Sequence, residues 1–298
     1  MGAIRGRGQV ELDDGRRLDI RVTGPEDGRV LVFHHGTPGA AVREQLLETP
    51  AYELGLRVVS WSRPGYGDST RQPHRRIVDV VSDAQAVLDA LGVESCLVAG
   101  ATGGSPLALA CAARLPAADA ALVVSPVAPF DADGLNWLAG LGEDNAIATG
   151  HALVGEDSLR EYLASERDVM LAVTAAQVIE SLSTLLPEVD RAELTGALAE
   201  DIIAGLHEGL RTGVDGWLDD SLSLIRPWGF DLEEIDIPTM IWHGSVDSLS
   251  PPAHGRWLTE HVPDTTGHVL DGMGHLSLWA TQVPAMLDEL LHAVPARG

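Results

Sequence analysis

The sequence predicts an α/β fold in which a mostly parallel sheet of eight strands carries helices on both faces. Apolar runs typical of strands alternate with helical stretches from the N-terminus to about residue 125. The alternation stops between residues 126 and 226, where the pattern is helical, and it resumes at residue 227. Successive strand–helix–strand units form doubly wound sheets. We therefore expect a core of residues 1–125 and 227–298, with residues 126–226 inserted after the sixth strand as a helical cap, or lid.

The chain begins with a hairpin and continues with buried strands. Residues 8–12 and 17–22 alternate polar and apolar side chains around Asp13-Asp14-Gly15, which is typical of an antiparallel hairpin with one wet face. The other strands are mostly apolar, as expected when helices bury both faces of a sheet. We expect these strands at residues 30–34, 57–61, 96–99, 120–125, 238–243 and 267–270, and core helices at residues 41–54, 77–91, 107–115, 252–261 and 284–293.

The charge of the chain excludes two classes of partner. All 20 basic residues are Arg, 44 residues are acidic, and the formal net charge is −24. Such a surface repels nucleic-acid phosphates and anionic lipids, so we expect neither nucleic acid nor a membrane as a partner. The sequence has no apolar run near the roughly 18 residues that span a bilayer and no secretion signal. We expect a cytoplasmic monomer or homodimer, with Cys96 and Cys111 as buried, reduced thiols.

A sharp strand-to-helix reversal at Gly100-Ala101-Thr102-Gly103-Gly104 is the most informative stretch of the chain. Glycines are needed there because the two backbones approach closely and φ can turn positive. The spacing is that of a nucleophile elbow, Gly-x-nucleophile-x-Gly, which holds one side chain above the end of a sheet. Thr102 occupies the apex, where this motif normally has Ser. A tight turn without chemistry is the alternative interpretation.

Three further polar features follow strands of the expected sheet, at the edge where open α/β sheets bind ligands. Asp247 follows the penultimate strand, His275 follows the last one, and His35-Gly36-Thr37-Pro38 follows the third. Each has a plainer interpretation when taken alone: an Asx turn or helix cap, a solvated loop histidine, and a Gly/Pro turn. Their joint order with Thr102, which is nucleophile, acid and then histidine, favours a catalytic site.

Five segments of the chain match the pattern of one family. They are His34-His35-Gly36-Thr37-Pro38-Gly39, Arg63-Pro64-Gly65-Tyr66-Gly67-Asp68-Ser69, Gly100-Ala101-Thr102-Gly103-Gly104, His243-Gly244-Ser245-Val246-Asp247 and Gly272-Met273-Gly274-His275. With these segments the sequence resembles the α/β-hydrolase superfamily, and within it the soluble capped hydrolases. The resemblance covers nearly all of the chain except the expected cap. Thr in place of Ser at position 102 departs from the family pattern.

The resemblance implies acyl transfer at these positions. Thr102 would be the nucleophile, His275 the general base, and Asp247 the carboxylate that orients the histidine. The N–H groups of Thr37 and Gly103 would form the oxyanion hole.

Two residues are weaker alternatives for these roles. Asp131, after the sixth strand, could replace Asp247 as the acid, but its local pattern is poorer. Ser105 is the only serine near the elbow, but it lies about one turn into the helix and not at the apex.

Threonine at the elbow leaves three explanations open. Elbow residues adopt positive φ, where a β-branched side chain is an outlier. Thr102 could be an engineered change that slows turnover, a natural variant with weak esterase activity, or a group that only positions a substrate. These options lead to two enzyme hypotheses: a hydrolase of an ester, lactone or related acyl bond, and a cofactor-free lyase or cyclase that uses His275 and Asp247 as acid–base. A ligand-binding protein without activity is the third hypothesis.

We expect the cap to close a mainly apolar pocket for a small-molecule acyl substrate that is medium-sized and largely apolar. His35 and Trp217 are the candidate substrate contacts. Trp137, Leu138 and Leu218 are further candidates for the wall, although packing within the cap is the preferred interpretation for these residues and Trp217. The sequence has no metal-ligand spacing, phosphate loop or dinucleotide fingerprint, so we expect no metal and no cofactor.

Overall fold

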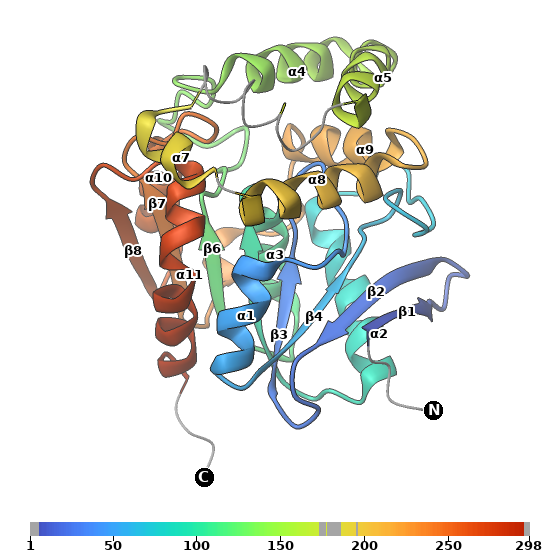
Figure 1. Cartoon of the computed structure of the whole chain (residues 1–298), viewed down its shortest axis with the longest axis vertical. Helices are drawn as coiled ribbons and strands as arrows, with labels where there is room; N and C mark the ends of the chain where they lie inside the picture. Colours follow the sequence, from blue (N-terminus) through green and yellow to red (C-terminus); the bar gives the residue numbers. More distant parts are fainter. Residues whose placement is uncertain (1–5, 173–176, 178–185, 195, 295–298) are drawn as a thin grey trace.

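The computed structural model describes residues 6–172, 177, 186–194 and 196–294 and contains an eight-stranded sheet (Figure 1). The strand order is β1-β2-β4-β3-β5-β6-β7-β8. The β1–β2 and β2–β4 pairs are antiparallel, whereas the pairs from β4 to β8 are parallel. The expected mostly parallel sheet is therefore confirmed. Its strands are β1 (Gly6–Glu11), β2 (Arg17–Thr23), β3 (Arg29–His34), β4 (Leu56–Trp61), β5 (Cys96–Ala101), β6 (Ala118–Val124), β7 (Thr239–Gly244) and β8 (Thr265–Leu270).

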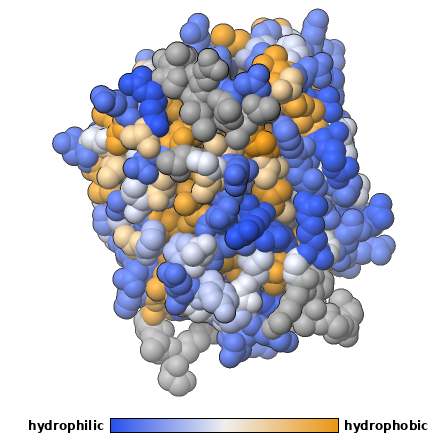
Figure 2. All heavy atoms as spheres, viewed as in Figure 1, coloured by the Kyte–Doolittle hydropathy of each residue, from blue (hydrophilic) through white to orange (hydrophobic). Residues whose placement is uncertain are grey.

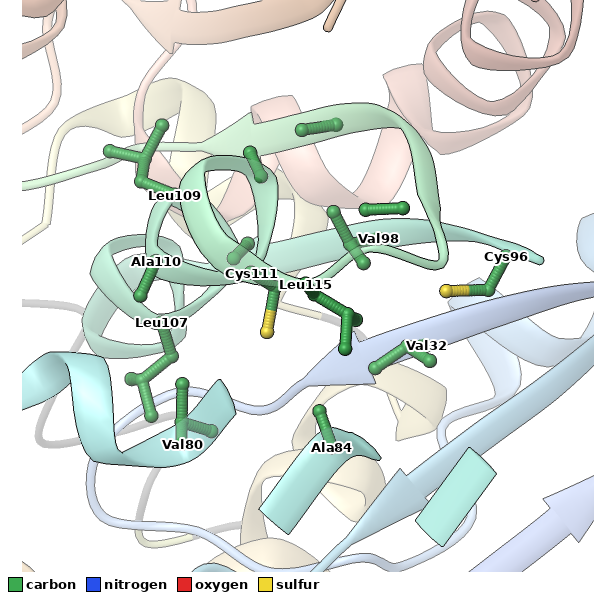
Figure 3. Packing of buried hydrophobic residues seen from close by; sticks show 14 of the residues in the cluster. Val32, Val80, Ala84, Cys96, Val98, Leu107, Leu109, Ala110, Cys111 and Leu115 are labelled. Carbon is green, nitrogen blue, oxygen red and sulfur yellow. The ribbon is translucent and has the colours of Figure 1, made fainter. Parts of the chain in front are cut away.

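Helices cover both faces of the sheet and enclose two apolar clusters. The larger cluster includes side chains of α2 (Val80–Leu91), α3 (Ser105–Arg114) and α10 (Pro252–His261). The second includes side chains of α1 (Gln45–Glu53) and α11 (His275–His292). Figure 3 shows side chains of α2 and α3 meeting those of β3 and β5 in the larger cluster. The strand ends that carry the candidate site thus belong to a packed sheet.

Both cysteines are free and fully buried in the larger cluster, as expected from their apolar surroundings (Figure 3). Burial raises the pKa of the Cys96 thiol to about 12. Burial likewise raises the pKa of Cys111, whose sulfur lies 3.5 Å from His34 Nε2. Neither thiol ionises near neutral pH, so both act as small apolar groups.

The chain between β6 and β7 is helical wherever the structure describes regular structure there. Its helices are α4 (Glu143–Val154), α5 (Glu156–Ala172), α7 (Glu188–Glu193), α8 (Gly196–Leu210) and α9 (Asp215–Leu224), which we call the inserted helices. Figure 1 shows them beyond the carboxyl ends of the parallel strands. This agrees with the helical pattern expected between residues 126 and 226.

Two core helices differ from the sequence-based expectation. α1 begins at Gln45 and not at residue 41. α11 begins at His275, nine residues before the expected start at Pro284, and continues through that proline. Proline is favoured at a first helical turn, which explains the misplaced start. The true start depends on Asp190, a residue distant in sequence that accepts N–H groups of the first turn.

The described helices include none that is long and apolar enough to cross a membrane. Hydrophilic residues cover much of the face shown in Figure 2, with apolar residues exposed between them.

Candidate active site

Thr102 lies at the apex of a tight turn between β5 and α3, in the short 3₁₀ helix Thr102–Gly104. Its φ is +50°. A Cβ atom on Gly100 would overlap the carbonyl oxygen of Gly104, and one on Gly104 would overlap that of His34. Both positions therefore need glycine, as the sequence predicts. The turn forces the central residue into the left-handed region, where L-residues other than glycine cost roughly 1–2 kcal/mol.

The Thr102 hydroxyl points toward the loop after β3. A Cβ atom on Gly36 would lie 2.8 Å from Thr102 Oγ1, so glycine at position 36 leaves the space that the hydroxyl occupies. Among the described residues the hydroxyl has no hydrogen-bond partner. It is therefore available to a ligand.

His275 and Asp247 form a buried pair. His275 Nδ1 lies 2.7 Å from Asp247 Oδ2. Because a carboxylate can only accept, the imidazole donates from Nδ1, which leaves a lone pair on Nε2 for a proton. Asp247 Oδ1 accepts the N–H groups of Leu249 at 2.9 Å and Ser250 at 2.8 Å. Asp247 thus fits both interpretations: Oδ1 accepts the backbone N–H groups of an Asx turn, and Oδ2 contacts His275.

The surroundings keep Asp247 charged and His275 basic. Burial opposes charge on the imidazole, but Asp247, through its charge and its hydrogen bond, together with Asp190, raises the pKa of His275 above its ordinary value. Burial also opposes ionisation of Asp247, yet contacts with His275 and His243 hold its pKa well below the usual range. The pair is thus arranged to accept a proton at Nε2 and to stabilise the imidazolium that forms.

Thr37 and Gly103 lie against each other at the ends of β3 and β5. A Cβ atom on Gly103 would overlap Thr37 Oγ1 and lie 3.4 Å from the Thr37 nitrogen. In the part of the chain that the structure describes, the Thr37 N–H has no hydrogen-bond acceptor. The structure therefore brings together the two residues whose N–H groups the family resemblance assigns to an oxyanion hole.

A buried ion pair holds the Thr37 loop against α9. Asp220 Oδ2 accepts the Thr37 hydroxyl at 2.9 Å and the Arg63 guanidinium at 2.6 Å. Arg63 also donates to the carbonyl oxygens of His35 at 2.5 Å and Gly36 at 2.9 Å. Arg63 and Asp220 are 1% and 4% exposed. One guanidinium and one carboxylate thus join this loop to the inserted helices.

Two further groups complete the surroundings of Asp220. Arg75 donates to its Oδ1 at 2.6 Å, and the Tyr66 hydroxyl donates to its Oδ2 at 2.9 Å. Burial opposes ionisation, but Arg63 and Arg75 hold the pKa of Asp220 far below its usual range. Sequence reasoning missed Asp220. The acidic pair Asp219-Asp220 in an otherwise buried helix stretch was the available signal, since buried carboxylates need partners.

A cavity of about 210 Å³ has both Thr102 and His275 in its wall. Most other lining groups are apolar or glycine. They come from the end of β3 and the loop after it, from α8 and from the start of α11, and include Phe33, Gly36, Pro38, Leu198, Ile202, Leu206, Leu276 and Trp279. The polar side chains in the wall besides the two named first are His35, Glu44, Ser125 and Asp201. The cavity thus suits a mainly apolar ligand placed between Thr102 and α8.

His35 and Ser125 bring unpartnered polar atoms to this region. His35 Nδ1 lies 2.8 Å from the Gly36 carbonyl oxygen, so Nδ1 carries the proton. Burial and the nearby Arg63 hold the pKa of His35 well below its ordinary value, so the ring is neutral and Nε2 is an acceptor. Among the described residues neither His35 Nε2 nor Ser125 Oγ has a partner. Ser125, at the end of β6 with φ +47°, was missed from the sequence.

Trp217, which was predicted as a substrate contact, is not among the described residues that line this cavity. Trp217 and Leu218 belong to a cluster formed by the inserted helices themselves. Trp137 is buried and donates its indole N–H to the Ala128 carbonyl oxygen, whereas Leu138 is exposed. None of the four belongs to the described cavity lining. α8 supplies the wall instead, because its apolar face turns toward the sheet.

The two alternative site residues lie elsewhere or are already engaged. Asp131 is exposed and lines a separate surface cavity beside Trp257. The Ser105 hydroxyl is fully buried and donates to the carbonyl oxygens of Gly100 at 3.0 Å and Val124 at 3.1 Å. Asp247 is therefore the carboxylate that contacts His275, and the Ser105 hydroxyl supports the turn.

One acidic group in the described structure has ligand atoms close enough to hold a cation. It consists of Asp19, Asp68 and Glu208, and it lies outside the cavity lining. Arg7 already pairs with Glu208 at 3.1 Å, and Arg211 pairs with Asp68 at 2.8 Å. These guanidinium groups provide the counter-charge at this cluster.

Comparison with known proteins places the chain in a family. The model described as alpha/beta hydrolase fold matches residues 29–280. The chain belongs to the α/β-hydrolase family. It is 33% identical over 258 residues to a non-heme chloroperoxidase of Streptomyces lividans, covering 83% of this chain and 84% of that protein. It is 26% identical over 267 residues to 3-oxoadipate enol-lactonase 1 of Acinetobacter baylyi, covering 88% of each.

The fold is shared with solved structures of this α/β-hydrolase family. An alpha/beta hydrolase fold protein from Chitinophaga pinensis superposes with a TM-score of 0.70 at 15% identity, over 97% of this chain and 98% of that one. The family membership and these relatives identify the chain as an enzyme of the hydrolase type.

Proposed function

We propose that this α/β-hydrolase cleaves a carboxylic ester, lactone or related acyl bond, with Thr102 as the nucleophile and His275 as the general base. The observation that carries the proposal is one cavity wall that holds both residues, with buried Asp247 2.7 Å from His275. The chain order of these three residues and the similarity to a protein named as an enol-lactonase support it.

The proposed reaction has two stages. Thr102 Oγ1 attacks the substrate carbonyl carbon while His275 Nε2 takes the hydroxyl proton, and the N–H groups of Thr37 and Gly103 stabilise the oxyanion. The tetrahedral intermediate collapses, and His275 returns the proton to the leaving alcohol. A water molecule, deprotonated by His275, then attacks the acyl-threonine ester. The carboxylic acid leaves, and His275 returns the proton to Thr102 Oγ1, which restores the free hydroxyl. Asp247 stabilises the imidazolium in both stages.

The cavity limits the substrate class. Its mainly apolar wall and its volume of about 210 Å³ suit a small to medium acyl group. We propose that the inserted helices act as a lid over this group, since α8 supplies Leu198, Ile202 and Leu206 to the wall.

The test compares hydrolysis of a short p-nitrophenyl ester by the natural chain and by Thr102→Ser. We expect slow turnover in the natural chain and an increase of at least about tenfold in kcat for Thr102→Ser, because serine removes the β-branch from the positive-φ apex. His275→Ala should abolish turnover in both backgrounds. Absence of turnover in both folded proteins, across several acyl lengths, would exclude the proposal.

One observation favours a second candidate, a non-hydrolytic lyase or cyclase that uses His275 and Asp247 as acid–base. In the described structure the Thr102 hydroxyl makes no hydrogen bond to His275, so it is not held in the position of an activated nucleophile. In that case Thr102 only donates a hydrogen bond to the substrate. Thr102→Ala then keeps much of the activity that His275→Ala loses, whereas the acyl-transfer proposal requires both variants to be inactive.

A further inference from the structure

Asp190 joins the inserted helices to the first residue of α11. It lies in α7 and is fully buried. Its Oδ2 accepts the backbone N–H of His275 at 2.9 Å, and its Oδ1 accepts the N–H of Ser277 at 2.8 Å and the Ser277 hydroxyl at 2.6 Å. The first N–H groups of a helix have no partner within it. Asp190 supplies partners from 85 residues away in the sequence.

Close packing shows that this contact is built into the fold. A Cβ atom on Gly274 would lie 2.5 Å from the carboxyl carbon of Asp190, so only glycine before His275 leaves room for the carboxylate. The Gly274 N–H donates to Ser277 Oγ at 2.8 Å, which extends the network across the start of α11. The Asp190 carboxylate thus fixes the backbone from residue 274 to residue 277.

The same carboxylate acts on the charge of the His275 imidazole. Two acidic groups from different elements affect it: Asp247 from the loop after β7 and Asp190 from α7. His243 Nε2 lies 3.5 Å from Asp247 Oδ2, the same oxygen that His275 contacts. Burial lowers the pKa of His275, while Asp247 and Asp190 raise it. Removing either negative charge therefore makes the imidazole less basic.

We propose that Asp190 is a positioning residue for the reaction: it holds the backbone of His275 in place and its charge favours the imidazolium that each proton transfer forms. This inference rests on the proposed function, in which His275 is the general base. If Asp190 acts in this way, proton transfer by His275 depends on the position of α7. The inserted helices then hold the histidine in place in addition to covering the cavity.

The decisive variant is Asp190→Asn. Its single amide oxygen can still accept from Ser277, but the negative charge is lost, and the NH₂ group then faces the His275 N–H, which loses its acceptor. We expect kcat for a p-nitrophenyl ester to fall about tenfold with little change in KM, because a displaced general base slows proton transfer without changing the cavity. The acid limb of the pH profile of kcat/KM should move down by about 0.5 to 1 pH unit, since that limb reports the pKa of His275.

A matched control separates positioning from general destabilisation. Asp83 is also a buried carboxylate, with Arg16 at 2.6 Å, but it lies in α2 and is not part of the cavity. Asp83→Asn should lower the melting temperature and leave the acid limb unchanged. If Asp190→Asn behaves like this control, with an unmoved limb and kcat within twofold of the natural chain, the inference is wrong.

A readout without turnover keeps this inference separate from the proposed function. The NMR titration of the His275 imidazole, identified by its loss in His275→Gln, reports the same pKa whether or not an ester is cleaved. A downward shift in Asp190→Asn supports the action of Asp190 on His275 even if no ester is hydrolysed. An unshifted titration overturns it even if the enzyme is an active esterase.

Discussion

Thr102 combines a β-branched side chain with a left-handed backbone. Its φ of +50° follows from the glycine contacts on both sides of the turn. Glycine adopts this region without steric cost, whereas other L-residues lose roughly 1–2 kcal/mol there. The backbone at this position is therefore strained. Such strain is typical of functional sites, which supports a functional role for the Thr102 side chain.

The first prediction is that Thr102→Gly stabilises the protein while removing the hydroxyl. We expect the free energy of unfolding to rise by about 0.5–1 kcal/mol, because relief of the positive φ exceeds the added entropy of the unfolded glycine. Urea denaturation measures this change. The control is Thr49→Gly, at an exposed position inside α1, which should destabilise by up to about 1 kcal/mol. If Thr102→Gly lowers the free energy of unfolding as much as Thr49→Gly does, the backbone at Thr102 is not strained.

The sequence predicts the site residues that follow strands and misses those that come from the insertion. Thr102, Asp247 and His275 each lie within five residues after the end of a strand. Parallel strands end at one edge of the sheet, so their proximity follows from topology. Asp190 and Asp220 reach the site from helices without a local motif. Asp190 accepts from His275, which is 85 residues away in the sequence, and Asp220 accepts from Thr37, which is 183 residues away. Nothing in the neighbouring sequence fixes such contacts.

At the scale of elements, the Arg63–Asp220 pair links α9 to the loop that carries Thr37. The guanidinium donates to two carbonyl oxygens of this loop and to the carboxylate. Arg75 binds the other carboxylate oxygen. Arg63, Arg75 and Asp220 are all buried. Removing one of these charges leaves an uncompensated charge in the interior and lowers the stability of the protein.

We predict that Asp220→Asn destabilises the protein by about 3–5 kcal/mol, because two buried guanidinium groups lose their shared counter-charge. Esterase activity should fall in the fraction that remains folded, since the Thr37 hydroxyl loses its charged acceptor. Thermal unfolding and the specific activity of folded protein test both parts. Asp68→Asn removes an exposed pair with Arg211 and should cost less than about 1 kcal/mol. Equal effects of the two variants would mean that the buried pair contributes no more than a surface pair.

The elements themselves were predictable where the pattern is local. All eight strands were expected, the first two from alternating polar and apolar residues around a turn and the other six from mostly apolar runs bounded by turns. The start of α11 was not predicted. Proline is common in the first turn of a helix, so Pro284 suggested a start there, whereas the residue that caps the true start is Asp190 of α7. The inserted helices were expected as helices, but their apolar faces do not distinguish cavity wall from internal packing. Trp217 was therefore a candidate substrate contact although packing within the insertion was preferred, and α8 contributes residues to the described cavity wall.

On the scale of the whole molecule, we expect the charge of the chain to disfavour anionic substrates. The chain carries a formal net charge of −24. The described cavity wall includes the carboxyl groups of Glu44 and Asp201 and no Arg. A substrate carboxylate would thus meet two acidic groups and no arginine in the described wall.

We predict that an ester with a terminal carboxylate is a poorer substrate than its neutral isostere, and that the difference grows with pH. Burial, with Asp201 and Glu48 nearby, raises the pKa of Glu44 to about 8, whereas Arg21 opposes this shift. Glu44 is therefore mostly protonated at neutral pH and becomes negative as the pH rises through about 8. The ratio of kcat/KM for p-nitrophenyl pentanoate over p-nitrophenyl hydrogen glutarate should be at least about 10 near neutrality, which corresponds to about 1.4 kcal/mol.

Between about pH 7 and 9 that ratio should rise further in the natural chain and stay level in Glu44→Gln, which cannot ionise. The glutarate carboxylate is fully ionised across this range, so a change in the ratio reports the enzyme. Added salt should reduce the contribution of the distant surface charge to this ratio of kcat/KM values. It should leave most of the contribution of the carboxyl groups in the cavity wall. A ratio near 1, or one that rises equally in Glu44→Gln, would mean that these carboxyl groups do not face the acyl chain and that selection comes from the surface alone.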